Sequence, residues 1–131
     1  ALIFVDVDKF KVFNDEHGHQ MGDVILREIS SLMRENVRKK DIVARWGGEE
    51  FVIVSPDTND STAARLAESL RATIAEHVFM RDTDQADARI TISAGVASLQ
   101  KHRTKAALIE AADAALYEAK KKGRNQVHVS R

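Results

Sequence analysis

The chain has 131 residues, which fits one domain with one hydrophobic core. Hydrophobic residues make up 44% and charged residues 31%, and 20 Lys and Arg balance 20 Asp and Glu. The resulting net charge of zero argues against a globally basic protein that binds nucleic acid or a membrane surface, so an anion site has to be a local cluster. Without cysteine there is no disulfide or thiolate chemistry, and no apolar run is long enough to span a membrane.

The chain opens with a continuous apolar run, Ala1–Val5, which predicts a central strand covered on both faces. The run leads directly into Asp6-Val7-Asp8. Residues two apart in an extended segment point to the same side, so these two carboxylates can face one site.

A polar stretch follows, and residues 17–23 contain two glycines that we interpret as a loop leading into a helix. From residue 24 to about residue 37, apolar side chains recur every three or four positions and predict an amphipathic helix. Residues 56–61 carry turn and cap residues, and the apolar spacing from Ala63 to Ile74 predicts a second long helix.

A hairpin is predicted between these helices, with Ile42–Trp46 and Phe51–Ser55 as its strands and Gly47-Gly48 as a tight turn. Gly-Gly is a strong hairpin signal because tight turns need positive φ, which glycine reaches cheaply. Two acids, Glu49-Glu50, follow at the tip. Taken by itself, such a turn is more often an ordinary one with solvated acids.

The last third of the chain is predicted to hold a strand, a helix and a short strand. Residues 78–89 show no clear periodicity, and we interpret them as a short edge strand and a loop. Ile90–Leu99 alternates as a strand, and Gly95 within it indicates a close approach of another backbone. Thr104–Lys122 has the spacing of a helix, which a following glycine caps, and Val127–Val129 is a brief final strand.

This order of elements predicts an α/β (α+β) sandwich of the ferredoxin-like, split βαβ kind, with a central, mostly antiparallel sheet flanked by helices. In that arrangement the end of the first strand and the hairpin tip lie side by side at one rim of the sheet. Asp6, Asp8, Glu49 and Glu50 are therefore candidates for a shared carboxylate cluster. Such a cluster suits Mg²⁺ bound to a nucleoside triphosphate, because Mg²⁺ prefers hard oxygen ligands.

Five motifs in register resemble the GGDEF domains, the diguanylate cyclase family, over essentially the whole chain. They are Phe4-Val5-Asp6-Val7-Asp8-Lys9-Phe10-Lys11, Asn14-Asp15-xx-Gly18-His19-xx-Gly22-Asp23, Arg45-Trp46-Gly47-Gly48-Glu49-Glu50-Phe51, Ser93-Ala94-Gly95-Val96-Ala97 and Ala112-Asp113-xxx-Leu116-Tyr117-xx-Lys120-xxx-Arg124-Asn125. The resemblance implies a single nucleotidyl-cyclase-like catalytic domain over residues 1–131. The usual N-terminal turn and first helix of the family are missing from it, so we expect exposed apolar surface.

The family joins two GTP molecules into cyclic di-(3′,5′)-guanylate and releases two pyrophosphates, with Mg²⁺ or Mn²⁺. Carried over by position, Asp6 and Glu49 would bind the metal with the carbonyl of Val7. Glu49, Asp6 and Glu50 would form the catalytic group, whose work is positioning and charge stabilisation.

The resemblance also implies the substrate contacts. Asn14 and Asp23 would read guanine, whose N1–H and N2–H₂ groups can donate to a carboxylate where adenine offers no matching pair. Lys120 and Arg124 would hold the outer phosphates, helped by backbone amides of residues 9–11. Two further positions would let the backbone lie against the nucleotide: Gly47 and Gly48.

A second site is implied by Arg38-Lys39-Lys40-Asp41, which matches the family's RxxD inhibitory site in its spacing from the signature. There, cyclic di-guanylate binds as an intercalated dimer and inhibits the enzyme. Arginine suits this because its planar fork can bond guanine and phosphate and can stack on a base. Arg65, on the second helix, would supply a further cation. Without the resemblance, Arg38 and Asp41 would be read as a simple ion pair.

The symmetric product implies two facing sites, so we expect catalysis by a homodimer. The family also implies an upstream sensory or regulatory domain and a cytoplasmic domain without its own membrane insertion. Two other interpretations stay open: a catalytically silent module that senses cyclic di-guanylate or GTP, and another nucleotidyl cyclase or polymerase-palm-like enzyme. Asn14 and Asp23 argue against adenine as the base.

Some candidate residues have a plain structural alternative. Asp8 can act as a cap or ion-pair partner as easily as near a metal. His17 and His19 could bind a transition metal, but a His pair is more often part of hydrogen-bonded structure. Trp46 fits a core or rim aromatic better than a base-stacking platform.

Overall fold

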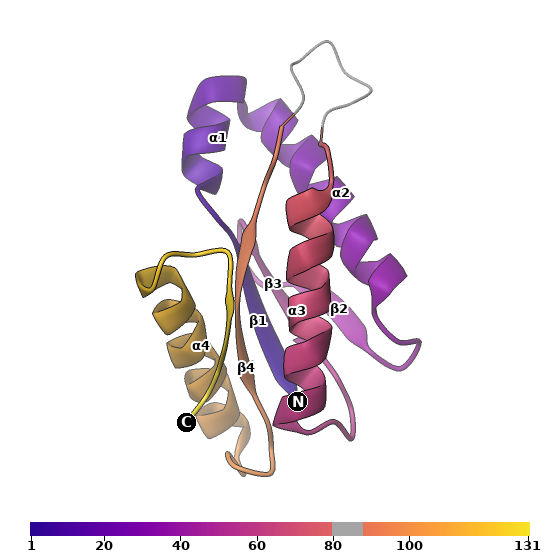
Figure 1. The fold of residues 1–131 in the computed structure, drawn as a ribbon, viewed down its shortest axis with the longest axis vertical. Helices are drawn as coiled ribbons and strands as arrows, with labels where there is room; N and C mark the ends of the chain where they lie inside the picture. The colour runs from indigo at the N-terminus through magenta and orange to yellow at the C-terminus, as the bar shows by residue number, and fades with distance from the viewer. Residues whose placement is uncertain (80–87) are drawn as a thin grey trace.

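The computed structural model describes residues 1–79 and 88–131, and Figure 1 shows its helices and strands. Within these residues no helix is both long enough and apolar enough to cross a membrane. The elements in chain order are β1 (Leu2–Val7), α1 (Phe10–His17), α2 (His19–Asn36), β2 (Ile42–Arg45), β3 (Glu50–Val54), α3 (Asp60–Glu76), β4 (Ile92–Ala97), α4 (Lys105–Lys121) and β5 (Val127–Val129).

The strands form one mixed sheet in the order β2-β3-β1-β4-β5. The central strand, β1, is antiparallel to both neighbours, and β5 is parallel to β4. Helices α2 and α3 lie on one side of the sheet and α4 on the other (Figure 1). The predicted sandwich is therefore confirmed.

Side chains of β1 alternate between two cores, which explains the continuous apolar run. Ile3, Val5 and Val7 join the core under α1, α2 and α3. Leu2 and Phe4 join the smaller core under α4, with Val52 of β3. By the same alternation Asp6 belongs to the α4 face of the sheet.

Gly95 in β4 lets α4 pack directly on the strand backbone. A Cβ built on Gly95 would lie 2.2 Å from the carbonyl oxygen of Ala112 and 2.3 Å from the backbone nitrogen of Leu116. No side chain fits at this distance. The close approach predicted for Gly95 is confirmed, and its partner is the middle of α4.

The prediction of a loop over residues 17–23 is wrong, because all of these residues except Gly18 are helical. The missed helix α1 buries Phe10 and Phe13 on one face, and it ends where Gly18 adopts a φ of 89°. Helix α2 then begins at His19 and not near residue 24. Position 22, inside α2, requires a glycine because a Cβ there would lie 1.9 Å from Asn14 Oδ1. Gly22 thus allows α1 and α2 to pack closely.

The turn between β2 and β3 also differs from the prediction. Neither Gly47 nor Gly48 has a positive φ. Within the described residues, the glycines with positive φ are Gly18 and Gly123. The N–H groups of Trp46 and Gly47 both donate to the carbonyl of Glu50, at 2.8 and 3.3 Å. The connection is thus wider than a two-residue turn. The guanidinium of Arg45 holds it by donating to the carbonyls of Gly47 and Gly48.

The edge strand and loop predicted for residues 78–89 lie mostly outside the described residues. At the borders of this segment, Phe79 and Ala88 form an antiparallel bridge with backbone bonds of 2.9 and 3.0 Å.

Helix α4 covers only part of its face of the sheet. It packs on β4, β1 and β5. On the same face, over β2 and β3, the paired residues Ile42 and Val54 are 58% and 39% exposed. Trp46 is 57% exposed, and its ring packs on Phe4 with centroids 5.5 Å apart. These residues form an exposed apolar strip beside α4, and Trp46 lies at its rim.

Candidate active site

The end of β1 and the turn before β3 meet at one rim of the sheet. Asp6 is directly opposite Glu50 in the strand register, and the N–H of Val7 donates to the carbonyl of Glu49 at 3.1 Å. Asp6, near the end of β1, and Glu49, in the turn just before β3, are therefore neighbours although they lie far apart in sequence. This is the arrangement on which the predicted nucleotide site depends.

Asp6 is buried, with 6% of its surface exposed, and its charge is matched by a cation from α4. The ammonium group of Lys120 forms an ion pair with Asp6 Oδ2. Burying a carboxylate without such a partner would be costly. Lys120 lies near the end of α4, and α4 runs along β4 towards the acid rim, the rim of the sheet where Asp6 and Glu49 meet (Figure 1). The structure thus brings Lys120 to the predicted site.

Glu49 is half-buried beside other acids. Burial is the largest influence that raises the pKa of its carboxyl, followed by the negative charge of Asp6; Lys120 opposes this, and Glu50 adds to it. Burial and the neighbouring acids together outweigh the opposing effect of Lys120 on this pKa.

The four-acid cluster predicted at this rim does not form, because Asp8 turns to other partners. Its carboxylate accepts hydrogen bonds from Thr91, Ser93 and the backbone of Asn125. Across residues 1–79 and 88–131, no three or more Asp, Glu or His side chains gather closely enough to hold a metal ion. A cation here would have two carboxylates as protein ligands at most.

Asp6 and Glu49 nevertheless fit a Mg²⁺ or Mn²⁺ ion. Both offer hard oxygen atoms, and a divalent cation would offset the repulsion between these two neighbouring carboxylates. Mg²⁺ in proteins is commonly bound by one or two carboxylates together with substrate phosphates and water. The donor set is therefore consistent with a metal that arrives with a nucleotide.

The two predicted guanine-binding residues lie on adjacent helices at the same end of the molecule. Asn14 of α1 touches Gly22 of α2, and the next residue, Asp23, is exposed. The buried Oδ1 of Asn14 has no hydrogen-bond partner within the described part of the chain. Buried acceptors without partners are rare, and this one packs against Gly22 of α2.

Arg124 lies in a strained turn after α4, and Lys9 has a similar backbone at the start of α1. Their φ values are 65° and 54°. A cavity of about 400 Å³ is bordered by both residues together with Asp8 and Asn125. The predicted phosphate-binding cation Arg124 thus faces a hollow beside the acid rim.

Sequence reasoning missed several residues that shape this site. Arg45 holds the glycine turn, and its signal is a cation two residues before Gly-Gly. Thr91 and Ser93 bond Asp8, and their signal is hydroxyl residues within an otherwise apolar strand.

The predicted inhibitory pair is preformed. Arg38 donates from Nε to Asp41 Oδ2 and from Nη2 to Asp41 Oδ1, both at 3.0 Å, and its backbone N–H also donates to Asp41. Nη2 additionally donates to Thr58 at 2.6 Å. Burial acts to raise the pKa of Asp41, but hydrogen bonds from the side chain and backbone of Arg38 lower it overall. Arg65 is exposed on α3, and within residues 1–79 and 88–131 no hydrogen bond or ion pair joins it to this pair.

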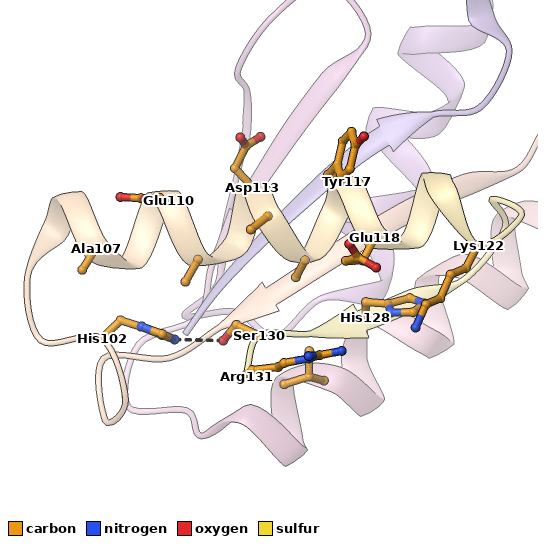
Figure 2. Close-up of a pocket in the computed structure, with 14 residues that line it drawn as sticks. His102, Ala107, Glu110, Asp113, Tyr117, Glu118, Lys122, His128, Ser130 and Arg131 are labelled. Atoms are coloured by element: carbon orange, nitrogen blue, oxygen red, sulfur yellow. Dashed lines mark hydrogen bonds between the residues drawn. The ribbon is translucent and has the colours of Figure 1, made fainter.

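A larger hollow, of about 860 Å³, lies elsewhere, around α4 and β5 (Figure 2). His102 Nε2 and Ser130 Oγ are 3.0 Å apart there, while Glu110, Asp113 and Tyr117 point away from them (Figure 2). Asp6, Glu49, Lys120 and Arg124 are not among its lining residues. Size alone would therefore have misplaced the candidate site.

Comparison with known sequences gives a family match over almost the whole chain. The profile described as diguanylate cyclase, GGDEF domain, matches residues 1–126. Diguanylate cyclase DosC of Escherichia coli K12 is 40% identical over 129 residues, which cover 98% of this chain and 28% of DosC. The chain thus spans little more than a quarter of that relative.

Solved structures agree with this match. The active GGEEF domain of a diguanylate cyclase from Vibrio cholerae superposes with a TM-score of 0.89 at 38% identity, covering 99% of this chain and 81% of that one. The GGDEF domain of DgcB from Caulobacter crescentus, in complex with c-di-GMP, superposes with a TM-score of 0.91 at 36% identity, covering 98% and 75%.

Proposed function

The chain belongs to the diguanylate cyclase GGDEF-domain family, and from that membership we propose that it is a diguanylate cyclase. It would condense two GTP molecules into cyclic di-(3′,5′)-guanylate and release two pyrophosphates. The observation that carries the proposal is the meeting of Asp6, near the end of β1, with Glu49, in the turn before β3, and with Lys120 beside them. The signature motif is in its Gly-Gly-Glu-Glu-Phe form, with both acids present.

Asp6 and Glu49 would hold Mg²⁺ or Mn²⁺, with the Val7 carbonyl as a further oxygen and Glu50 beside them. The metal would neutralise phosphate charge and help to activate the attacking 3′-hydroxyl. The protein's own contribution is positioning: Lys120 and Arg124 would bind the outer phosphates, because fixed cations stabilise charge that develops in phosphoryl transfer.

Asn14 and Asp23 would select guanine. The exposed Asp23 carboxylate would accept from the guanine N1–H and N2–H₂ groups, and the amide of Asn14 would contact the base beside it. Adenine lacks this set of donors, and a site left with unpaired polar groups rejects a ligand strongly. Gly47 and Gly48 would leave room for the nucleotide beside the turn.

The reaction needs a second copy of the chain, since each domain would bind one GTP and the product has two equal halves. We propose a homodimer whose two sites face each other, controlled by a regulatory domain elsewhere in the full-length protein. The product would bind at Arg38 and Asp41, with Arg65 as a further cation, and inhibit turnover. The complex of DgcB with c-di-GMP supports a nucleotide-binding role for this domain type.

The test is to incubate the chain with GTP and Mg²⁺, and separately with ATP and Mg²⁺, and to identify products by liquid chromatography and mass spectrometry. We expect cyclic di-guanylate from GTP only. Asp23→Ala should reduce discrimination between GTP and ATP at least about tenfold, whereas Glu35→Ala, an exposed acid on α2, should not. GTP binding without turnover would instead favour a silent sensing module.

A further inference from the structure

The carboxylate of Asp8 joins separate parts of the chain just beyond the end of β1. Oδ1 accepts from the Ser93 hydroxyl at 2.7 Å. Oδ2 accepts from the Thr91 hydroxyl at 2.7 Å and from the backbone N–H of Asn125 at 3.0 Å. Hydrogen bonds to an ionised carboxylate are stronger than those between neutral groups. Asp8 therefore fastens the end of β1 both to the start of β4 and to the turn that follows α4.

The turn after α4 has a backbone that needs such support. Gly123, Arg124 and Asn125 have φ values of 123°, 65° and 48°. Two consecutive left-handed residues with a Cβ are unfavourable by themselves and persist only where surrounding contacts impose them. The N–H of Arg124 donates to the carbonyl of Ala119 at 3.0 Å, and the N–H of Asn125 donates to Asp8. The Asp8 carboxylate thus bonds directly to a strained residue.

The side chain of Asn125 has a partner of its own on another helix. Arg71 of α3 donates from Nη1 to Asn125 Oδ1 at 2.8 Å. Arg71 is itself fixed by Glu68, with Nη2 and Oε1 2.6 Å apart. Asn125 is therefore held through both its backbone N–H and its side chain. These bonds fix the backbone next to Arg124, whose side chain is exposed.

We propose that Asp8 is a positioning residue that holds the turn at residues 123–125 so that Arg124 meets the substrate phosphates. This rests on the proposed function, in which Arg124 binds GTP. Asp8 also precedes Lys9, the N-cap residue of α1, and both border the same cavity of about 400 Å³ as Arg124. The Asp8 carboxylate therefore lies beside the cavity that Arg124 borders and is bonded to the turn that carries Arg124.

The test compares steady-state kinetics of three variants: Asp8→Asn, which weakens the bond to Asn125; Asn125→Val, whose β-branched side chain resists positive φ; and Arg124→Ala. Each should raise KM for GTP about tenfold, the effect of one lost charged hydrogen bond, with kcat within about twofold. The double variant Asp8→Asn/Arg124→Ala should match Arg124→Ala within about twofold, because Asp8 acts through Arg124.

Ser93→Ala is the matched control, since it removes a bond to the same carboxylate without touching the turn. Its KM should stay within about twofold of the unmodified chain. A purely structural role predicts lower thermal stability of Asp8→Asn with unchanged KM, which would overturn the proposal. A metal-binding role predicts a shift in the Mg²⁺ concentration for half activity that persists in the Arg124→Ala background, and this would overturn it too.

A measurement without turnover separates this proposal from the proposed function. If the chain makes no cyclic dinucleotide, the function fails, and the Asp8 contact is tested by amide hydrogen exchange of Asn125 measured by NMR. Exchange should be about tenfold faster in Asp8→Asn than in the unmodified chain, with little change in Ser93→Ala. Equal exchange rates in the unmodified chain and Asp8→Asn would overturn the proposal.

Discussion

The backbone N–H of Val7 donates to the carbonyl of Glu49 at 3.1 Å, which ties the end of β1 to the turn before β3. This bond sets two acids side by side, because Asp6 precedes Val7 on the buried strand. Burial raises the pKa of Glu49, and the like charge of Asp6 at short range adds to this rise. The geometry therefore leads directly to predictions about activity and stability.

Replacing Glu49 with Ala should lower turnover of GTP by at least about a hundredfold, the usual cost of losing a group that stabilises transition-state charge. The measurement is the initial rate of cyclic di-guanylate formation. Glu110→Ala, on the exposed face of α4, is the control and should retain full activity. Substantial product formation by Glu49→Ala would remove this carboxylate from the mechanism.

Replacing Glu49 with Gln should stabilise the fold at neutral pH in buffer with EDTA. In the unfolded chain the carboxyl loses its proton near its ordinary pKa of 4.5, and in the folded chain it does so at higher pH. The folded state thus binds more protons in this window, and the unmodified chain loses stability as pH rises through it. Thermal unfolding should give equal midpoints for the two proteins below about pH 4 and a higher midpoint for Glu49→Gln at pH 7. A constant difference at every pH would contradict the charge argument.

Gly48→Ala should separate folding from nucleotide binding. No atom lies within 4 Å of a Cβ built on Gly48, and its φ is not in the left-handed region. The midpoint of thermal unfolding should therefore stay within about 2 °C of the unmodified chain, as for most surface substitutions. If the backbone here lies against GTP, KM should rise about tenfold or more. An unchanged KM would remove Gly48 from the nucleotide site.

Gly95→Ala should destabilise the fold strongly. Its Cβ would meet two backbone atoms of α4 at 2.2 and 2.3 Å, and a helix backbone cannot move aside as a flexible side chain can. We expect a loss of about 3 kcal/mol or more in the free energy of unfolding, measured in urea. Gly48→Ala, the same chemical change in open space, is the matched control. A loss under about 1 kcal/mol would mean that α4 adjusts its position freely.

Arg38→Ala should relieve inhibition by added cyclic di-guanylate, raising the concentration for half inhibition about tenfold or more, because a bidentate charged contact is lost. Rates are measured at increasing product concentration. Arg34→Ala, an exposed arginine in the last turn of α2, is the control. Unchanged inhibition in Arg38→Ala would place the inhibitory site elsewhere.

The sequence by itself determined the type and order of most elements and the residues of the acid rim. Apolar periodicity predicted α2, α3 and α4, because burial of one helix face leaves a repeat of three and four positions. The unbroken run at the start of the chain predicted β1 with both faces covered, and Gly95 predicted a close backbone contact. The acids of the rim followed from the strand–hairpin order, which brings the two strand ends to one edge.

Only the tertiary structure decided how the local backbone and the acids are used. Helix α1 was missed because its two buried phenylalanines lie in a short polar segment, where local signals are weak. The Gly47-Gly48 turn is wider than predicted because Arg45 replaces the hydrogen bonds of a tight turn. The role of Asp8 depends on donors 83, 85 and 117 positions away, and no local pattern encodes contacts of that range. Sequence patterns report which faces are buried, whereas the partner of a buried polar group is fixed only when distant segments pack together.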